Sequence, residues 1–134
     1  MKRLTIREAE MLAQKFRIEL GLNMFEPIST KTVLRKLGIL TMYRPLSDNS
    51  FGISAKSESG KMFMLVNCNS TRGRQHFTIA HELYHLFYDK NPEPHMCGDI
   101  VSAAEKDANL FASAFLMPRE GILNIVSESE VKSH

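Results

Sequence analysis

The sequence predicts an α+β domain in which helices at both ends of the chain enclose a small antiparallel sheet. Helical patterns occupy the first third, strand patterns the middle and further helical patterns the remainder. A small sheet packed with about four to five helices in this order is typical of the α+β class. Because 134 residues suffice for one hydrophobic core and not for two, we expect residues 1–134 to form a single domain.

The first two helices have recognisable ends. Thr5 followed by Glu8 is a capping box, and apolar residues then recur at helical spacing until Gly21. Ser29 introduces a shorter helical pattern that ends at Gly38, since glycine readily closes a helix. The sequence therefore predicts two helices before the first strand.

Three strand patterns follow, over residues 39–43, 51–55 and 62–67. Residues 57–60, Ser-Glu-Ser-Gly, are typical of a turn. We therefore expect the last two strands to form a hairpin.

The longest helical pattern runs from about Arg72 to Tyr88 and is apolar on nearly all sides. Such a helix is normally buried. After a loop that contains Asn91-Pro92-Glu93-Pro94, a further helix is expected from about Ser102 to Leu116, and one more short helix after Arg119.

An HExxH motif, His81-Glu82-Leu83-Tyr84-His85, lies on the one polar side of the 72–88 helix. Residues four apart share a helix face, so both imidazoles can bind one zinc ion. Glu82 lies about 100° around the axis from His81, where it can act as general base on a water at the metal. The alternative is a pair of core histidines bonded to backbone carbonyls, which leaves Glu82 unexplained.

A catalytic zinc ion needs a third protein ligand. The downstream candidates are His95, Cys97, Asp99, Glu105 and Asp107. On the helix that begins near Ser102, Glu105 lies at the edge of the apolar face, whereas Asp107 points about 160° away from it. Helical phase therefore favours Glu105 as the third ligand and predicts that Asp107 faces away from the interior. His95 and Cys97 are expected in a solvated loop. Asn109, one turn after Glu105, is a candidate for orienting a ligand.

The composition excludes several other classes of protein. A net charge of +2 without a basic run gives no sign of nucleic-acid binding. No apolar stretch has transmembrane length, and none follows Met1-Lys2-Arg3 as in a secretion signal. Two cysteines, Cys68 and Cys97, make no disulfide framework. We therefore expect a cytoplasmic protein, and the oligomeric state stays open.

Two segments resemble the ImmA/IrrE family of zinc metallopeptidases. Residues 74–85 have the pattern RxxFTxAHExxH and residues 105–118 the pattern ExxANxFAxxxLMP, while residues 51–54 and 64–67 resemble that family's hairpin. The resemblance implies a gluzincin-like site on a cut-down thermolysin-like core. In such a site His81, His85 and Glu105 bind zinc and Glu82 is the base.

The resemblance also implies a substrate class. Relatives cleave a helix-turn-helix repressor of a mobile element or stress operon, which predicts a regulatory endopeptidase here. Two alternatives stay open, namely a non-enzymatic anti-repressor that retains the metal site and a toxin–antitoxin component. The chain departs from the family in two ways. Tyr84 stands where many members carry a small residue, and we expect it to narrow the cleft. The C-terminal region is also short relative to many relatives.

Overall fold

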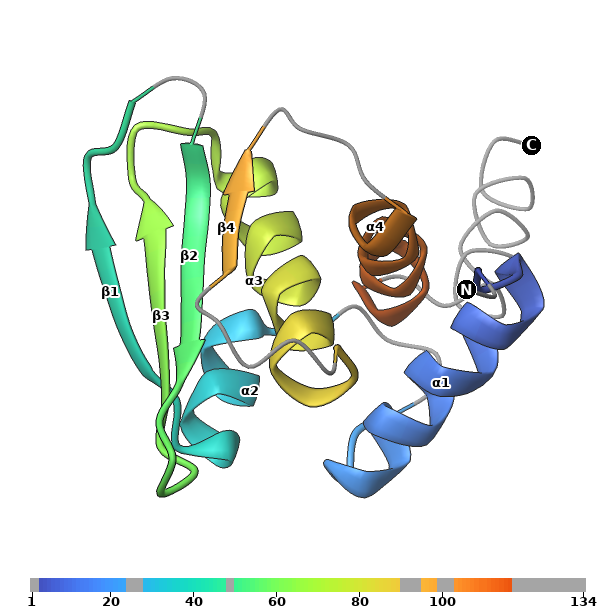
Figure 1. The fold of residues 1–134 in the computed structure, drawn as a ribbon. Coiled ribbons are helices and arrows are strands. Elements are labelled where there is room, and N and C mark those ends of the chain that lie inside the picture. Colours follow the sequence, from blue (N-terminus) through green and yellow to red (C-terminus); the bar gives the residue numbers. More distant parts are fainter. Residues whose placement is uncertain (1–2, 24–27, 48–49, 90–94, 99–102, 117–134) are drawn as a thin grey trace, which may run out of the picture.

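The computed structural model describes residues 3–23, 28–47, 50–89, 95–98 and 103–116, and these confirm the α+β class. The sheet lies at one side of the molecule, α3 packs against it, and α4 and α1 follow as further layers (Figure 1). The elements in chain order are α1 (Ile6–Glu19), α2 (Thr30–Leu37), β1 (Leu40–Arg44), β2 (Ser50–Lys56), β3 (Met62–Asn67), α3 (Arg72–Phe87), β4 (His95–Gly98) and α4 (Ala103–Leu116). The expected helix after Arg119 lies outside the described residues.

The first two helices begin and end at the predicted signals. The Thr5 side chain accepts a hydrogen bond from the Glu8 amide at 3.1 Å, and the Glu8 carboxylate accepts one from the Thr5 amide at 3.1 Å. Ser29 caps α2, and Gly38 closes it with φ of 68°, in the left-handed region that favours glycine. Local capping residues therefore account for where these helices begin and where α2 ends.

The sheet is mixed, with strand order β1-β3-β2-β4. β2 and β3 form the expected antiparallel hairpin, but β1 pairs with β3 in parallel, so the expectation of an antiparallel sheet was wrong at this edge. The reason is that successive strands reverse direction, which leaves β1 and β3 running the same way. The chain after α3 forms β4, an edge strand antiparallel to β2, where a loop was expected.

The central helix α3 lies between the sheet and α4 (Figure 1). Its residues Ile79, Ala80 and Leu83 are at most 1% exposed. The helix is therefore buried on several sides, as its apolar periodicity predicted, and its polar residues are drawn into the interior with it.

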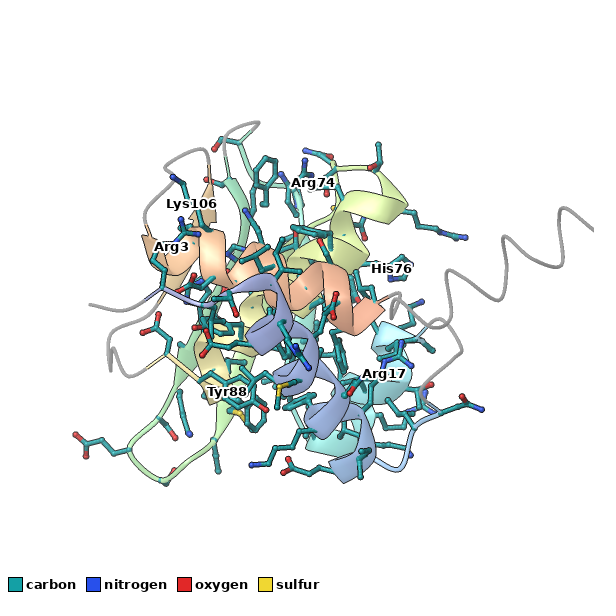
Figure 2. All side chains as sticks on the ribbon, turned by 90° about the vertical axis from the view of Figure 1, so that its right-hand side faces the viewer. Arg3, Arg17, Arg74, His76, Tyr88 and Lys106 are labelled. Atoms are coloured by element: carbon teal, nitrogen blue, oxygen red, sulfur yellow. The ribbon has the colours of Figure 1, made fainter. Side chains whose placement is uncertain are left out.

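α1 holds the C-terminal end of α4. The ring of Phe16 lies edge-on to that of Phe115, with centroids 5.3 Å apart. The buried guanidinium of Arg17 donates to the carbonyls of Phe115 at 2.9 Å, of Leu116 at 3.3 Å and of Asn23 (Figure 2). Because the last carbonyls of a helix carry partial negative charge, this cation stabilises the end of α4 and fixes its position.

None of the helices within the described ranges combines the length and the hydropathy that a membrane span requires.

Candidate metal centre

Two helices bring three metal-capable side chains together in the interior. His81 and His85 come from α3 and Glu105 from α4, and their ligand atoms all lie within 4.8 Å of one another. The two Nε2 atoms are 3.2 Å apart. Glu105 places Oε2 at 2.9 Å from Nε2 of His81 and Oε1 at 3.1 Å from Nε2 of His85. Among the described side chains, Glu105 is the candidate for a third ligand that lies next to both histidines.

The other ring nitrogen of each imidazole, Nδ1, makes a hydrogen bond to a side-chain oxygen. Nδ1–H of His81 donates to Oδ1 of Asn109 at 2.7 Å, and Nδ1–H of His85 donates to Oδ2 of Asp89 at 2.7 Å. Both partners are acceptors at these oxygens, so the protons must be on Nδ1. With the Nδ1 proton used in this way, Nε2 of each imidazole faces Glu105 and can offer its lone pair to a metal ion.

This arrangement fits a metal cation. Two nitrogen lone pairs and a carboxylate repel one another in a buried site unless a cation or protons lie between them. Two imidazoles and one carboxylate are also a common set of protein ligands at catalytic metal sites. The His81–His85–Glu105 group could therefore bind a metal ion.

Glu82 follows His81 directly on α3 and does not belong to this group. The residue is fully buried, and its Oε2 accepts a hydrogen bond of 2.5 Å from Oγ of Ser54 on β2. The structure thus provides a second carboxylate, adjacent in sequence to a metal-capable histidine.

The expectation that Asp107 faces outward was wrong. Asp107 is 9% exposed, accepts a hydrogen bond of 3.2 Å from the Leu4 amide and lies 3.5 Å from Nε of Arg3. α4 packs against both α3 and α1, and the residues just before α1 contact Asp107, so more than one side of this helix is buried. Asp107 nevertheless lies outside the metal-capable group.

Tyr84 packs between the two helices that carry the site. Its ring lies 5.8 Å from that of Phe111 on α4 and 5.8 Å from that of His85. Burial raises the pKa of Tyr84, and the carboxylates of Asp107 and Asp89 raise it further. The side chain of Tyr84 therefore fills space at the interface between α3 and α4.

Sequence reasoning missed Ser54 and Asp89. Asp89 lies four residues after His85, so helical spacing could have revealed it. No local pattern links Ser54 to Glu82, because that contact depends on how β2 packs against α3. The backbone of His95 and Cys97 belongs to β4 and not to a loop, while their side chains and Asp99 lie outside the described part of the chain.

The chain was compared with known protein families and with curated proteins. The family model described as IrrE N-terminal-like domain, of a peptidase family, matches residues 34–134. The matched range contains the whole site, including Ser54 and Asp89, and covers more than half of the chain. No match was found among the curated proteins.

Proposed function

The chain belongs to the IrrE N-terminal-like peptidase family, and from this premise we propose that it is a zinc-dependent endopeptidase. In this proposal His81, His85 and Glu105 are the metal ligands and Glu82 is the general base. The observation that carries the proposal is the buried His81–His85–Glu105 group, with a second buried carboxylate on the residue that follows His81. We further propose that residues 1–134 act as one domain, because α1 is anchored on α4.

The donor set supports zinc as the metal. Zinc accepts imidazole nitrogen and carboxylate oxygen, and catalytic zinc sites use three protein ligands and leave one position open. When bound, zinc would polarise the scissile carbonyl and acidify a water molecule. The hydrogen bonds from Nδ1 to Asn109 and Asp89 would hold both imidazoles in place for it.

Glu82 would carry out the proton transfers. As the water oxygen attacks the carbonyl carbon, a carboxylate oxygen of Glu82 takes a proton from the water. The same proton then goes to the amine nitrogen as the C–N bond breaks. Burial of Glu82 supports this role. Once Glu82 has taken the proton from the water molecule, its shielding from bulk solvent favours delivery of that proton to the amine nitrogen.

A peptidase acts on a protein or peptide, and the substrate that we propose is a helix-turn-helix repressor of a mobile element or stress operon. The sequence resemblance described above supports this choice. A repressor acts on DNA inside the cell, and we accordingly propose that the protein is cytoplasmic. The test is to incubate the zinc-loaded protein with a candidate helix-turn-helix repressor and to look for a discrete cut by mass spectrometry. Glu82→Gln protein serves as the control and should leave the repressor intact.

A further inference from the structure

We propose that Ser54 is a positioning residue for Glu82, and that the contact between Gly52 and Thr78 sets the distance from β2 to α3 that allows Ser54 to reach it. The inference rests on the proposed function, because it concerns the orientation of the general base. It assigns a role to three residues outside the HExxH motif.

The hydrogen bond itself is short and buried. Oγ of Ser54 lies 2.5 Å from Oε2 of Glu82, and the two residues are 2% and 0% exposed. Since an ionised carboxylate carries no hydrogen, the serine hydroxyl is the donor. A hydrogen bond to a charged group away from water is among the stronger ones in proteins, so it can fix the orientation of a flexible side chain.

Strand and helix match in register at this point. Gly52 and Ser54 are two residues apart on one face of β2, about 6.6 Å along the strand. Thr78 and Glu82 are four residues apart on one face of α3, about 6 Å along the helix. Because these two distances nearly match, Gly52 can lie against Thr78 while Ser54 lies against Glu82.

The contact between Gly52 and Thr78 is too close for a side chain at position 52. A Cβ atom there would lie 2.7 Å from Cγ2 of Thr78 and 3.0 Å from the carbonyl oxygen of Leu65. The glycine thus permits a close approach of β2 to α3. Serine has a short side chain, so it reaches Glu82 only at such a distance.

The backbone of Ser54 is held on both sides. It pairs with Met64 of β3 and with His95 of β4. The hydroxyl is therefore presented from an ordered strand, whereas a glutamate side chain has three rotatable bonds. Small displacements of a catalytic group are costly in rate, so a fixed donor at this carboxylate should favour the chemical step more than substrate binding.

The first test uses stability and is independent of cleavage. Ser54→Ala is compared in two zinc-loaded backgrounds, one with Glu82 and one with Glu82→Gln, by thermal unfolding. A hydrogen bond to a carboxylate is roughly twice as strong as one to an amide, so the fall in Tm should be roughly twice as large with Glu82 present. An equal fall in both backgrounds would overturn the proposed contact.

The second test separates positioning from metal binding. Ser54→Ala should keep the Zn²⁺ affinity within about threefold, because the metal ligands are oriented by Asn109 and Asp89. With any protein that the unmutated chain cuts, kcat should fall by about 10-fold or more while KM changes little. Ser54→Thr keeps the hydroxyl and should restore most of kcat.

The outcomes of this second test distinguish the two proposals. If Ser54→Ala cuts with the unmutated kcat while Glu82→Gln does not cut, the positioning role is wrong and the proposed function stands. If the unmutated protein and Glu82→Gln both fail to cut, the proposed function fails, and the comparison of Tm values still decides the contact.

The third test addresses the spacing. Gly52→Ala should lower kcat as Ser54→Ala does, because a methyl group at position 52 pushes β2 away from α3. Adding Thr78→Ser removes the obstructing Cγ2 atom and should recover part of that loss. Gly73→Ala, on the same helix as Thr78, is the matched control, because its Cβ would meet nothing within 4 Å. A kcat of Gly52→Ala equal to that of Gly73→Ala would overturn the role of the spacing.

Discussion

His85 donates its Nδ1–H to the carboxylate of Asp89, one helical turn further along the chain, at 2.7 Å. His81 donates instead to the amide oxygen of Asn109. The two imidazoles are therefore held by chemically different acceptors. A carboxylate is a stronger hydrogen-bond acceptor than an amide oxygen, so the ring of His85 should be held the more firmly for metal binding.

Replacing Asp89 by asparagine should weaken zinc binding. The substitution keeps the shape of the side chain and removes the charge, and changes of this kind typically lower metal affinity by roughly 10- to 100-fold. Competition with a zinc chelator measures the effect. Glu58→Gln, an exposed acid in the turn between β2 and β3, is the control and should bind zinc as the unmutated protein does. Equal affinities of the two variants would show that Asp89 has no such role.

Glu105 and Asp107, two residues apart on α4, should respond differently to loss of charge. Glu105→Gln removes an anionic oxygen from the metal-capable group and should sharply reduce the zinc found by elemental analysis. Asp107→Asn should leave the zinc content unchanged. It should lower Tm instead, since Asp107 accepts from the Leu4 amide and lies close to Arg3. The opposite ranking of zinc contents would exclude Glu105 as the ligand.

Arg17→Met should destabilise the fold. The methionine keeps an apolar stem but leaves the carbonyls of Asn23, Phe115 and Leu116 without their donor, at a cost of about 2–4 kcal/mol in the free energy of unfolding. Urea unfolding measures this loss. Arg7→Met, on the exposed side of α1, should stay within about 0.5 kcal/mol of the unmutated protein. A similar effect of both changes would contradict the anchoring role of Arg17.

Tyr88 should make the stability depend on pH in the alkaline range. Burial, with a smaller effect of Glu19, raises the pKa of Tyr88 to about 12. A raised pKa means that the folded state holds the proton more tightly than the unfolded state, whose tyrosines titrate near about 10. The resulting stability is fully present below about pH 10 and is lost as the pH rises toward about 12. Tyr88→Phe should therefore show a shallower decline over this range in urea unfolding, and an unchanged decline would contradict the assignment.

Much of the fold could be predicted from local sequence. Capping residues such as Thr5 and Ser29 fix helix ends through hydrogen bonds within a few residues, and helical phase predicted that Glu105 faces the interior, where it lies next to the two histidines. These features depend on contacts between near neighbours or on a regular period. The sequence contains both kinds of information directly.

The remaining features depend on contacts between distant segments. β4 has only four residues, too few to show the alternation of apolar and polar side chains that marks a strand. It is defined by its pairing with β2. The burial of Asp107 involves contacts with Arg3 and Leu4, about 100 residues earlier in the chain, just before α1. The contact of Ser54 with Glu82 requires the packing of β2 on α3, which no pattern within either segment reveals.

The most direct test of the account is the rate of repressor cleavage by Glu82→Gln protein that carries as much zinc as the unmutated protein. The substitution preserves the size of the side chain and the three metal-capable residues, so fold and zinc content should be unchanged. Loss of a general base typically lowers the rate by about 10²–10⁴-fold, and we expect the discrete cut to disappear accordingly. If Glu82→Gln instead relieves repression as well as the unmutated protein does, the chain acts by binding, and its role as a peptidase is wrong.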